Sequence, residues 1–503
     1  MRLNTRIFLL LLPLLASDCL ASPKREMRAV WVATVWGIDW PSVRGADRAT
    51  AEKQKKELCR LLDRAESLNF TTVYFQVRGM GDVMYSSRLE PWSSFLTGRR
   101  GADPGWDPLE TAVRECHARG LECYAWVNPF RWSTGTDYDT PQDRQWKENG
   151  WLLRHGKYTV FNPGLEEARA HIVDICREIV EGYDVDGLVF DDYFYPNRIP
   201  ADKTAPDYEL YLAEAPWMTF GDWRRACVHK AVADVSAMIA DTRPGCRFGI
   251  SPAGVAGKHD TSARKWGVEP CRVKAADWQY EEIYSDPLGL MYQGTVDFIS
   301  PQIYWPTTHS TAPYAALAGW WSMASCHFGS HLYSSLTLER IEKGNLRENI
   351  LDVGRQIDHN RGLSIDGNIG VAVYSARFLP LVEGMLRQKF SLPALSPELR
   401  HRPGDAPEAP RRVSLGRRHL EWEGVKGEPG EVMRYTVYIV PPGISHEEAM
   451  AENGDGIDGG YLHGVVYGTD TDLPECPEGA SIAVCTLDGR SAESQPAWVR
   501  QRQ

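Results

Sequence analysis

Short apolar runs alternate with longer amphipathic stretches from about residue 28 to residue 390. An apolar run bounded by Gly or Pro is typical of a buried strand, whereas apolar positions that repeat every three or four residues are typical of a helix. The strands that this pattern predicts are Ala29–Val35, Thr72–Val77, Glu122–Val127, Gly187–Asp191, Arg247–Ser251, Asp297–Ile303, Leu332–Leu336 and Ile369–Tyr374. The helices predicted between them include Ala51–Leu68, Pro108–Arg119, Glu166–Glu181, Gly221–Asp241 and Leu346–His359.

Strands that alternate with helices in this way favour a closed parallel sheet. We therefore predict an α/β fold, a (β/α)8 TIM barrel, over residues 27–390. Gly120 and Gly182 follow two of the predicted helices and are typical helix stops. The extra length of the chain falls after the strands, in segments that would build the active-site face of such a barrel. These segments are rich in Trp, which indicates an extended cleft.

The sequence changes character after Leu392. The Pro-containing stretches within residues 391–407 are typical of a stiff linker. Over residues 408–503, short runs that alternate apolar and polar positions, such as Tyr435–Ile439, replace the helices. They predict a small all-β sandwich similar to fibronectin type III. We expect this module to be an independent unit that the chemistry does not need.

The first 21 residues have the features of an export signal. Basic residues precede the apolar run Ile7–Leu15, and small residues follow it. We therefore expect residues 1–21 to be removed and the protein to be exported to the periplasm, the cell envelope or the medium. Cys19 raises the alternative of a lipoprotein, which Asp18 disfavours because a lipobox has a small residue at that place. We expect no integral membrane segment after removal of the signal, since no other apolar run is long enough.

The net charge and the cysteine content argue against several classes of function. The formal net charge of −11 argues against binding to nucleic acid or to an anionic membrane surface. No C-x-x-C pair and no Cys/His cluster with zinc spacing occurs, so we expect no metal and no cofactor. The 13 His are scattered, which disfavours a metal-dependent hydrolase or deacetylase. We interpret the cysteines as buried thiols, with Cys476 and Cys485 as the one pair considered for a local disulfide.

The candidate chemistry centres on residues 186–196, where a predicted strand ends in Asp191 and Asp192 and the rings of Tyr193 and Tyr195 follow. Carboxylates at the carboxyl end of a barrel strand stand where such enzymes keep catalytic residues, and neighbouring rings suit a sugar. Side-chain alternation directs Asp191 toward the barrel axis, which makes it the first choice for nucleophile or base. Asp192 and the two tyrosines are expected to contact substrate from the rim. The alternative is an acidic cap followed by aromatic residues that pack on the rim.

Glycoside cleavage normally uses a second carboxyl group as the acid. The candidates are Asp82, Asp286 and Asp39, of which the first two are preferred. Each also fits a cap on a turn, and Asp before Pro, as at Asp286, is a common turn signal. If no partner exists, an acetamido group of the substrate would act as the nucleophile.

Polar and aromatic residues at other strand ends complete the candidate site. Burying a polar group costs free energy unless it finds a partner, which a sugar hydroxyl would supply. The polar candidates are Gln76, Arg78, Asn128, Gln302 and Tyr304, with hydrogen bonds among themselves as the alternative. The candidates for stacking on a sugar are Trp36, Trp126 and Trp305, with core packing as the alternative. The residues expected to converge at the carboxyl face are Asp191, Asn128, Arg78 and Gln302.

Four motifs along the chain resemble those of one known family. They are Arg28–Val35, Ala125–Pro129, Asp186–Pro196 and Ser300–Trp305. In this order they resemble the glycosyl hydrolase-like 10 family over residues 27–340, with weaker support to residue 390. The resemblance implies an exported bacterial barrel, often followed by a fibronectin-like module. Such proteins are related to polysaccharide-cleaving enzymes, and some relatives are associated with peptidoglycan glycan strands. This chain departs from many relatives at Val189, where they have a polar residue such as His.

The residues and the resemblance together predict an exported glycoside hydrolase whose partner is a polysaccharide. The expected substrate is a peptidoglycan-type glycan strand, and Asp191 is expected to be the essential carboxylate. The alternative is a non-catalytic glycan-binding protein, in which the cleft and rings persist but the carboxylate pair is incomplete. The substitution Asp191→Asn separates these functions, because a binding protein has no activity to lose.

Overall fold

The computed structural model describes residues 22–365, 368–402, 404–427 and 431–501, so the predicted export signal lies outside the described residues. Within them, eight parallel strands close into a barrel in the order β1-β11-β10-β9-β8-β7-β3-β2, which confirms the predicted (β/α)8 fold. These strands are β1 (Arg28–Val32), β2 (Thr72–Arg78), β3 (Glu122–Val127), β7 (Gly187–Phe190), β8 (Arg247–Ile250), β9 (Phe298–Ile299), β10 (His331–Thr337) and β11 (Ile369–Tyr374). Each overlaps one of the strands predicted from the sequence.

Helices cover the outside of the barrel. The main ones are α1 (Arg48–Ser67), α3 (Pro108–His117), α5 (Glu166–Gly182), α7 (Phe220–Thr242), α10 (Tyr314–Phe328), α11 (Leu346–Leu363) and α12 (Leu379–Lys389). In β7, Leu188 and Phe190 pack against this helical layer, whereas Val189 packs in the barrel interior, as the alternation predicts. None of the described helices has the length and apolar character that crossing a bilayer requires.

Aromatic rings fill the interior of the barrel. They belong to Trp31, Tyr74, Tyr124, Trp126, Phe298 and Tyr333. Two glycines make room for them, because a Cβ at Gly187 would collide with the ring of Tyr124 and one at Gly249 with the ring of Phe298. The interior is therefore a packed core rather than an open channel.

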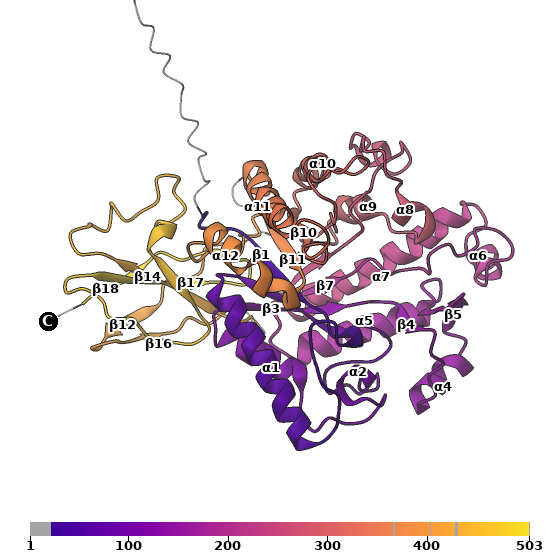
Figure 1. Cartoon of the computed structure of the whole chain (residues 1–503), viewed down its shortest axis with the longest axis horizontal. Helices are drawn as coiled ribbons and strands as arrows, with labels where there is room; N and C mark the ends of the chain where they lie inside the picture. Colours follow the sequence, from indigo (N-terminus) through magenta and orange to yellow (C-terminus); the bar gives the residue numbers. More distant parts are fainter. Residues whose placement is uncertain (1–21, 366–367, 403, 428–430, 502–503) are drawn as a thin grey trace, which may run out of the picture.

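The long segments that follow the strands carry structure of their own. Their elements are α2 (Ser94–Thr97), β4 (Arg131–Thr134), α4 (Pro141–Glu148), β5 (Leu152–His155), β6 (Tyr158–Phe161), α6 (Tyr208–Glu214), α8 (Trp278–Glu282) and α9 (Pro287–Tyr292). The strands β4, β6 and β5 form a separate antiparallel sheet in the segment after β3. In Figure 1, α6 and β5 lie at the end of the barrel opposite to the C-terminal module. Because these elements follow barrel strands, this end is the carboxyl face of the barrel.

The C-terminal module is all-β, as predicted. Its strands are β12 (Arg411–Leu415), β13 (His419–Glu423), β14 (Arg434–Val440), β15 (Leu462–Val466), β16 (Asp470–Asp472), β17 (Ser481–Leu487) and β18 (Ala497–Arg500). They form a sheet in the order β12-β13-β16 and a second in the order β15-β14-β17-β18. Trp422 of the first sheet and Tyr435 of the second share one core, so the sheets form a sandwich. Cys476 and Cys485 are free thiols, so the disulfide considered for this pair is not formed.

The module and the preceding linker pack against the amino end of the barrel. Arg434 of β14 forms a buried ion pair with Glu122 at the start of β3. The Tyr467 hydroxyl donates to Asp186, just before β7, at 2.9 Å. Arg402 of the linker donates to Asp297, just before β9, at 2.7 Å. Three barrel strands therefore meet a polar partner from beyond residue 390.

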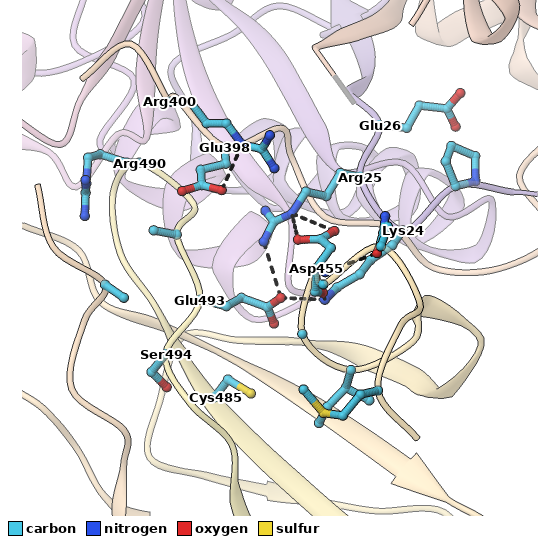
Figure 2. A pocket seen from close by; sticks show the side chains of 18 of the residues that line it. Lys24, Arg25, Glu26, Glu398, Arg400, Asp455, Cys485, Arg490, Glu493 and Ser494 are labelled. Carbon is cyan, nitrogen blue, oxygen red and sulfur yellow. Dashed lines mark hydrogen bonds and ion pairs between the residues drawn. The ribbon is translucent and has the colours of Figure 1, made fainter. Parts of the chain in front are cut away.

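A charged cavity of about 740 Å³ lies at this junction. Figure 2 shows Lys24 and Arg25, which precede β1, directed at Asp455 and Glu493 of the module. Lys24 Nζ lies 2.8 Å from Glu493 Oε2, and Arg25 Nε lies 3.0 Å from Asp455 Oδ1. Leu395 of the linker is buried and its N–H donates to the Lys24 carbonyl at 2.7 Å. The linker is thus part of the interface between the barrel and the module.

Candidate active site

Asp191 lies at the carboxyl mouth of the barrel, directly after β7, and is 4% exposed. Its Oδ2 accepts hydrogen bonds from Trp126 Nε1 at 3.1 Å and from Asn128 Nδ2 at 3.2 Å, both belonging to the neighbouring β3 segment. Its Oδ1 accepts from the Tyr193 N–H at 3.4 Å. Burial raises the pKa of Asp191, while the positive charge of Arg131 and these donors oppose the rise.

Asp192 is equally buried but has different surroundings. Its Oδ1 accepts from Gln302 Nε2 at 3.0 Å, and the same nitrogen donates to the Ser251 carbonyl at 3.0 Å. Burial, together with the charge of Asp191, raises the pKa of Asp192 to about 7. Asp191 has more donors and a nearby cation, which favours the negative charge on Asp191 and the proton on Asp192.

Asn128, Arg78 and Gln302 converge on this pair, as predicted, but Arg78 does so indirectly. Its Nε donates to Glu90 at 2.7 Å and its Nη1 to the carbonyl of Pro129 at 3.0 Å and to that of Asn128. Although burial opposes ionisation, the charge of Arg78 holds the pKa of Glu90 at about 2. Arg78 therefore fixes the turn that carries Asn128. Because its guanidinium is engaged in these hydrogen bonds, few of its donors remain for the predicted contact with substrate.

Gln76 also stabilises a loop, the segment that follows β1. Its Oε1 accepts from the N–H groups of Thr34 at 3.0 Å and Val35 at 2.9 Å, which fixes the segment after β1. This segment presents Trp36, whose side chain is 53% exposed and whose φ is +56°. A bulky residue in the left-handed region is strained, and such strain is kept where the surroundings hold it in place.

The aromatic candidates divide into exposed and buried rings. Tyr193 is 47% exposed, and Trp305 is half-buried. Trp126 forms the floor below Asp191. Tyr195 is buried, with its ring 5.4 Å from that of Tyr284. Core packing therefore accounts for Tyr195, while Trp36 and Tyr193 offer open faces to a ligand.

The ring of Tyr304 lies 5.9 Å from that of Tyr374, with the planes inclined by 27°. Tyr374 ends β11, so this pair joins the segment after β9 to the next-but-one strand of the barrel. The Tyr304 pair, Tyr193 and Trp36 thus come from three separate parts of the mouth. Their rings suit a ligand longer than one sugar ring.

The sequence-predicted acids have structural partners. Asp82 Oδ2 lies 2.9 Å from Arg100 Nη1, with both side chains buried. Asp286 caps α9 and accepts from Trp266 Nε1 at 3.0 Å, and its Oδ2 lies 3.0 Å from Lys265 Nζ. The third candidate, Asp39, accepts from the Ala33 and Arg377 N–H groups and from the Ser375 hydroxyl. Asp286 therefore fits the capping alternative and Asp39 ties together backbone N–H groups of two segments, whereas Asp82 is held by an ion pair.

We expect Asp82→Asn to lower the free energy of unfolding by about 3–5 kcal/mol, because it removes one partner of a buried ion pair. Asp286→Asn should cost less, because its partner Lys265 is partly exposed. The value of kcat should stay within about tenfold of wild type, since general acid catalysis contributes more than that. Urea unfolding and steady-state kinetics measure the two effects. Asp470→Asn, on an exposed strand of the module, is the control. A large loss of kcat with unchanged stability would restore either residue as the acid.

Arg131 is a site residue that the sequence did not single out. It begins β4, is 7% exposed, and its guanidinium lies 3.8 Å from the ring centroid of Tyr193. Its only sequence signal is its position two residues after the Ala125–Pro129 motif. Within the part of the chain that the structure describes, no group of three or more His, Cys, Asp or Glu side chains is arranged to hold a metal ion.

The sequence matches a family model and curated relatives. The model of the family described as glycosyl hydrolase-like 10 matches residues 26–350. Glycosyl hydrolase YngK of Bacillus subtilis (strain 168) is 34% identical over 425 residues, which cover 81% of this chain and 80% of that protein. Glycosyl hydrolase DigH of Escherichia coli (strain K12) is 34% identical over 332 residues, 63% of this chain and 74% of that protein. A solved structure, the PgaB (BpsB) glycoside hydrolase domain from Bordetella bronchiseptica, aligns with a TM-score of 0.47 at 14% identity, over 73% of this chain and 99% of that one.

Proposed function

The chain belongs to the glycosyl hydrolase-like 10 family, and on this premise we propose that it hydrolyses a β-linked glycan that contains amino sugars, namely a peptidoglycan glycan strand. Membership of the family makes it a glycoside hydrolase. The observation that carries the proposal is the pair of buried carboxyl groups, Asp191 and Asp192, at the barrel mouth. Their surroundings separate their protonation states, which is the pattern of an acid and its charged partner.

In this mechanism Asp192 donates its proton to the oxygen of the leaving group. Gln302 holds the carboxyl group in place through its hydrogen bond. Asp191 remains charged and stabilises the oxocarbenium-like transition state, as nucleophile or as base. If the acetamido group of the substrate attacks instead, Asp191 stabilises the positive charge that develops on that group.

Two observations support a polymer outside the cytoplasm. The exposed rings of Trp36 and Tyr193 lie on different segments of the mouth, after β1 and after β7, and would stack on separate sugar units. The features of residues 1–21 predict export, which would bring the enzyme to the cell wall. We therefore propose that the protein acts in the cell envelope or beyond it.

Incubation of the purified protein with a panel of glycans tests this function. The panel contains peptide-free peptidoglycan strands, intact peptidoglycan, chitin oligosaccharides and β-mannan, and products are identified by mass spectrometry. We expect cleavage of peptidoglycan strands, with chitin oligosaccharides second because they share the acetamido group. Cleavage of β-mannan alone would contradict the proposal, since that polymer has no amino sugar.

A further inference from the structure

Arg131 carries a nearly buried positive charge with no carboxylate within 4.0 Å among the described residues. Some buried arginines elsewhere in this protein do have such a partner: Arg78 pairs with Glu90, and Arg224 lies 2.9 Å from Asp207. Two others, Arg169 and Arg247, instead donate to backbone carbonyls or to a hydroxyl group. The Arg131 guanidinium stacks on the Tyr193 ring, which leaves its charge without an anionic partner. Burying such a charge costs free energy, so a retained one points to a function. The position of Arg131 at the barrel mouth indicates what that function is.

Several contacts fix the Arg131 side chain beside the catalytic pair. Its backbone N–H donates to Asn128 Oδ1 at 2.9 Å, and the amide nitrogen of the same Asn128 donates to Asp191. Its guanidinium stacks on Tyr193, whose N–H donates to the other oxygen of Asp191. Strand β4, which carries Arg131, is paired with β6 in the sheet that follows β3. Arg131 and Asp191 are therefore held by the same two neighbours.

Arg131 is also the one cation among the groups described around the two carboxyls. The donors from the β3 segment, Trp126 and Asn128, are neutral, and so is Gln302 from the segment after β9. Tyr193 and Tyr304 face Asp192, and their pKa values are raised, so both rings remain uncharged at neutral pH. The charge of Arg131 lowers the pKa of Asp191 more strongly than any of the hydrogen bonds to it.

We propose that Arg131 is a positioning residue that keeps Asp191 charged and so leaves the shared proton on Asp192. The inference rests on the proposed roles of the two carboxyls. It goes beyond them because it assigns the asymmetry of the pair to one side chain in the insertion after β3. Without this charge, two adjacent buried carboxyl groups would both hold their protons to higher pH.

The test replaces Arg131 by Met, which keeps the stacking area on Tyr193 but removes the charge. Both limbs of the pH profile of kcat/KM should move upward by about one unit, because the loss of a cation raises both carboxyl pKa values. On the acidic limb of the profile, the activity at a given pH should therefore fall about tenfold. Arg131→Lys should return the limbs toward their wild-type positions. Arg154→Met, on the exposed face of the same small sheet, is the matched control and should shift neither limb.

A second readout needs no substrate. The side-chain carboxyl carbons of Asp191 and Asp192 can be titrated by ¹³C NMR in the free protein, with Asp191→Asn and Asp192→Asn to assign the signals. An upward shift of the titration in Arg131→Met supports the proposal even if none of the glycans tested is cleaved. The proposal would be overturned if activity fell equally at every pH, with both limbs of the pH profile in their wild-type positions, or if the carboxyl titration did not change. Arg131 would then have only a packing role.

Discussion

Asp191→Asn is expected to lower kcat by a factor of about 10³ or more while the protein stays folded. The amide keeps the size of the carboxyl group, and its oxygen can still accept from Trp126 Nε1 and Asn128 Nδ2. Only the long hydrogen bond from the Tyr193 N–H is expected to break, because an amide nitrogen would replace its acceptor. The negative charge that would stabilise the transition state is gone, and no other charged carboxylate in the site replaces it if Asp192 is protonated.

Circular dichroism and thermal unfolding of Asp191→Asn check the fold, and steady-state kinetics on the cleaved glycan check the chemistry. Asp192→Asn is the matched variant. As the acid, Asp192 should matter most for substrates with poor leaving groups and least for activated aryl glycosides. The two variants should therefore differ on aryl glycosides, where Asp191→Asn stays inactive. Wild-type activity in Asp191→Asn would show that another carboxylate carries the reaction.

The second large effect concerns the junction between the barrel and the C-terminal module. We expect Arg434→Met to lower the free energy of unfolding by about 3–5 kcal/mol, because Glu122 would remain buried without its cation. The Arg434 guanidinium also donates to the Asp488 carbonyl at 2.8 Å and to the Ser491 hydroxyl at 3.1 Å, and these groups lose their donor. Chemical denaturation monitored by Trp fluorescence measures the loss.

The surface pair Arg411 and Glu408 provides the control. Its charged atoms lie 2.7 Å apart, but both side chains are mostly exposed, so Arg411→Met should cost less than about 1 kcal/mol. The double variant Glu122→Gln/Arg434→Met should recover part of the loss, because the uncompensated charge is removed. A cost near that of Arg411→Met would instead support the independent module that the sequence predicted. In either case the kinetics of the folded protein should not change, since the junction and the carboxyl mouth lie at opposite ends of the barrel (Figure 1).

The raised pKa of Asp192 also makes the stability of the protein depend on pH. The pKa of Asp192 is about 7 in the folded protein, above the ordinary value of an Asp in an unfolded chain. The folded state therefore holds a proton that the unfolded state releases, and stability from this group is lost as the pH rises toward and through 7. This cost is typical of a catalytic group whose environment is tuned for function.

The sequence by itself determined the barrel and the first carboxylate. Buried parallel strands need continuous apolar runs, and those runs are visible without any knowledge of the fold. The alternation in β7 also predicted which face of the strand Val189 and Leu188 would occupy. Since Asp191 directly follows that run, its place at the mouth followed from the strand itself. The all-β character of the module was visible for the same reason, in the period-2 runs that replace the helices.

Only the tertiary structure decided what the other polar residues do. Asp82, Asp286 and Arg78 look like site residues in the sequence, because a carboxylate or guanidinium after a strand has the same pattern whether it faces substrate or an ion-pair partner. In the structure these three residues have ion-pair partners, namely Arg100, Lys265 and Glu90. Arg131 could not be predicted for the opposite reason, since a lone Arg in a long loop gives no periodic signal.

The junction with the module was equally hidden in the sequence. Arg434 and Glu122 are 312 positions apart, and no local pattern connects them. The proline-containing stretches of the linker predict a stiff segment, but they do not predict whether that segment is exposed to solvent or packs against the barrel. Local patterns determine elements because propensity and periodicity act over a few residues. The partners of buried charges are chosen by the closed fold, which brings distant parts of the chain within reach of one another.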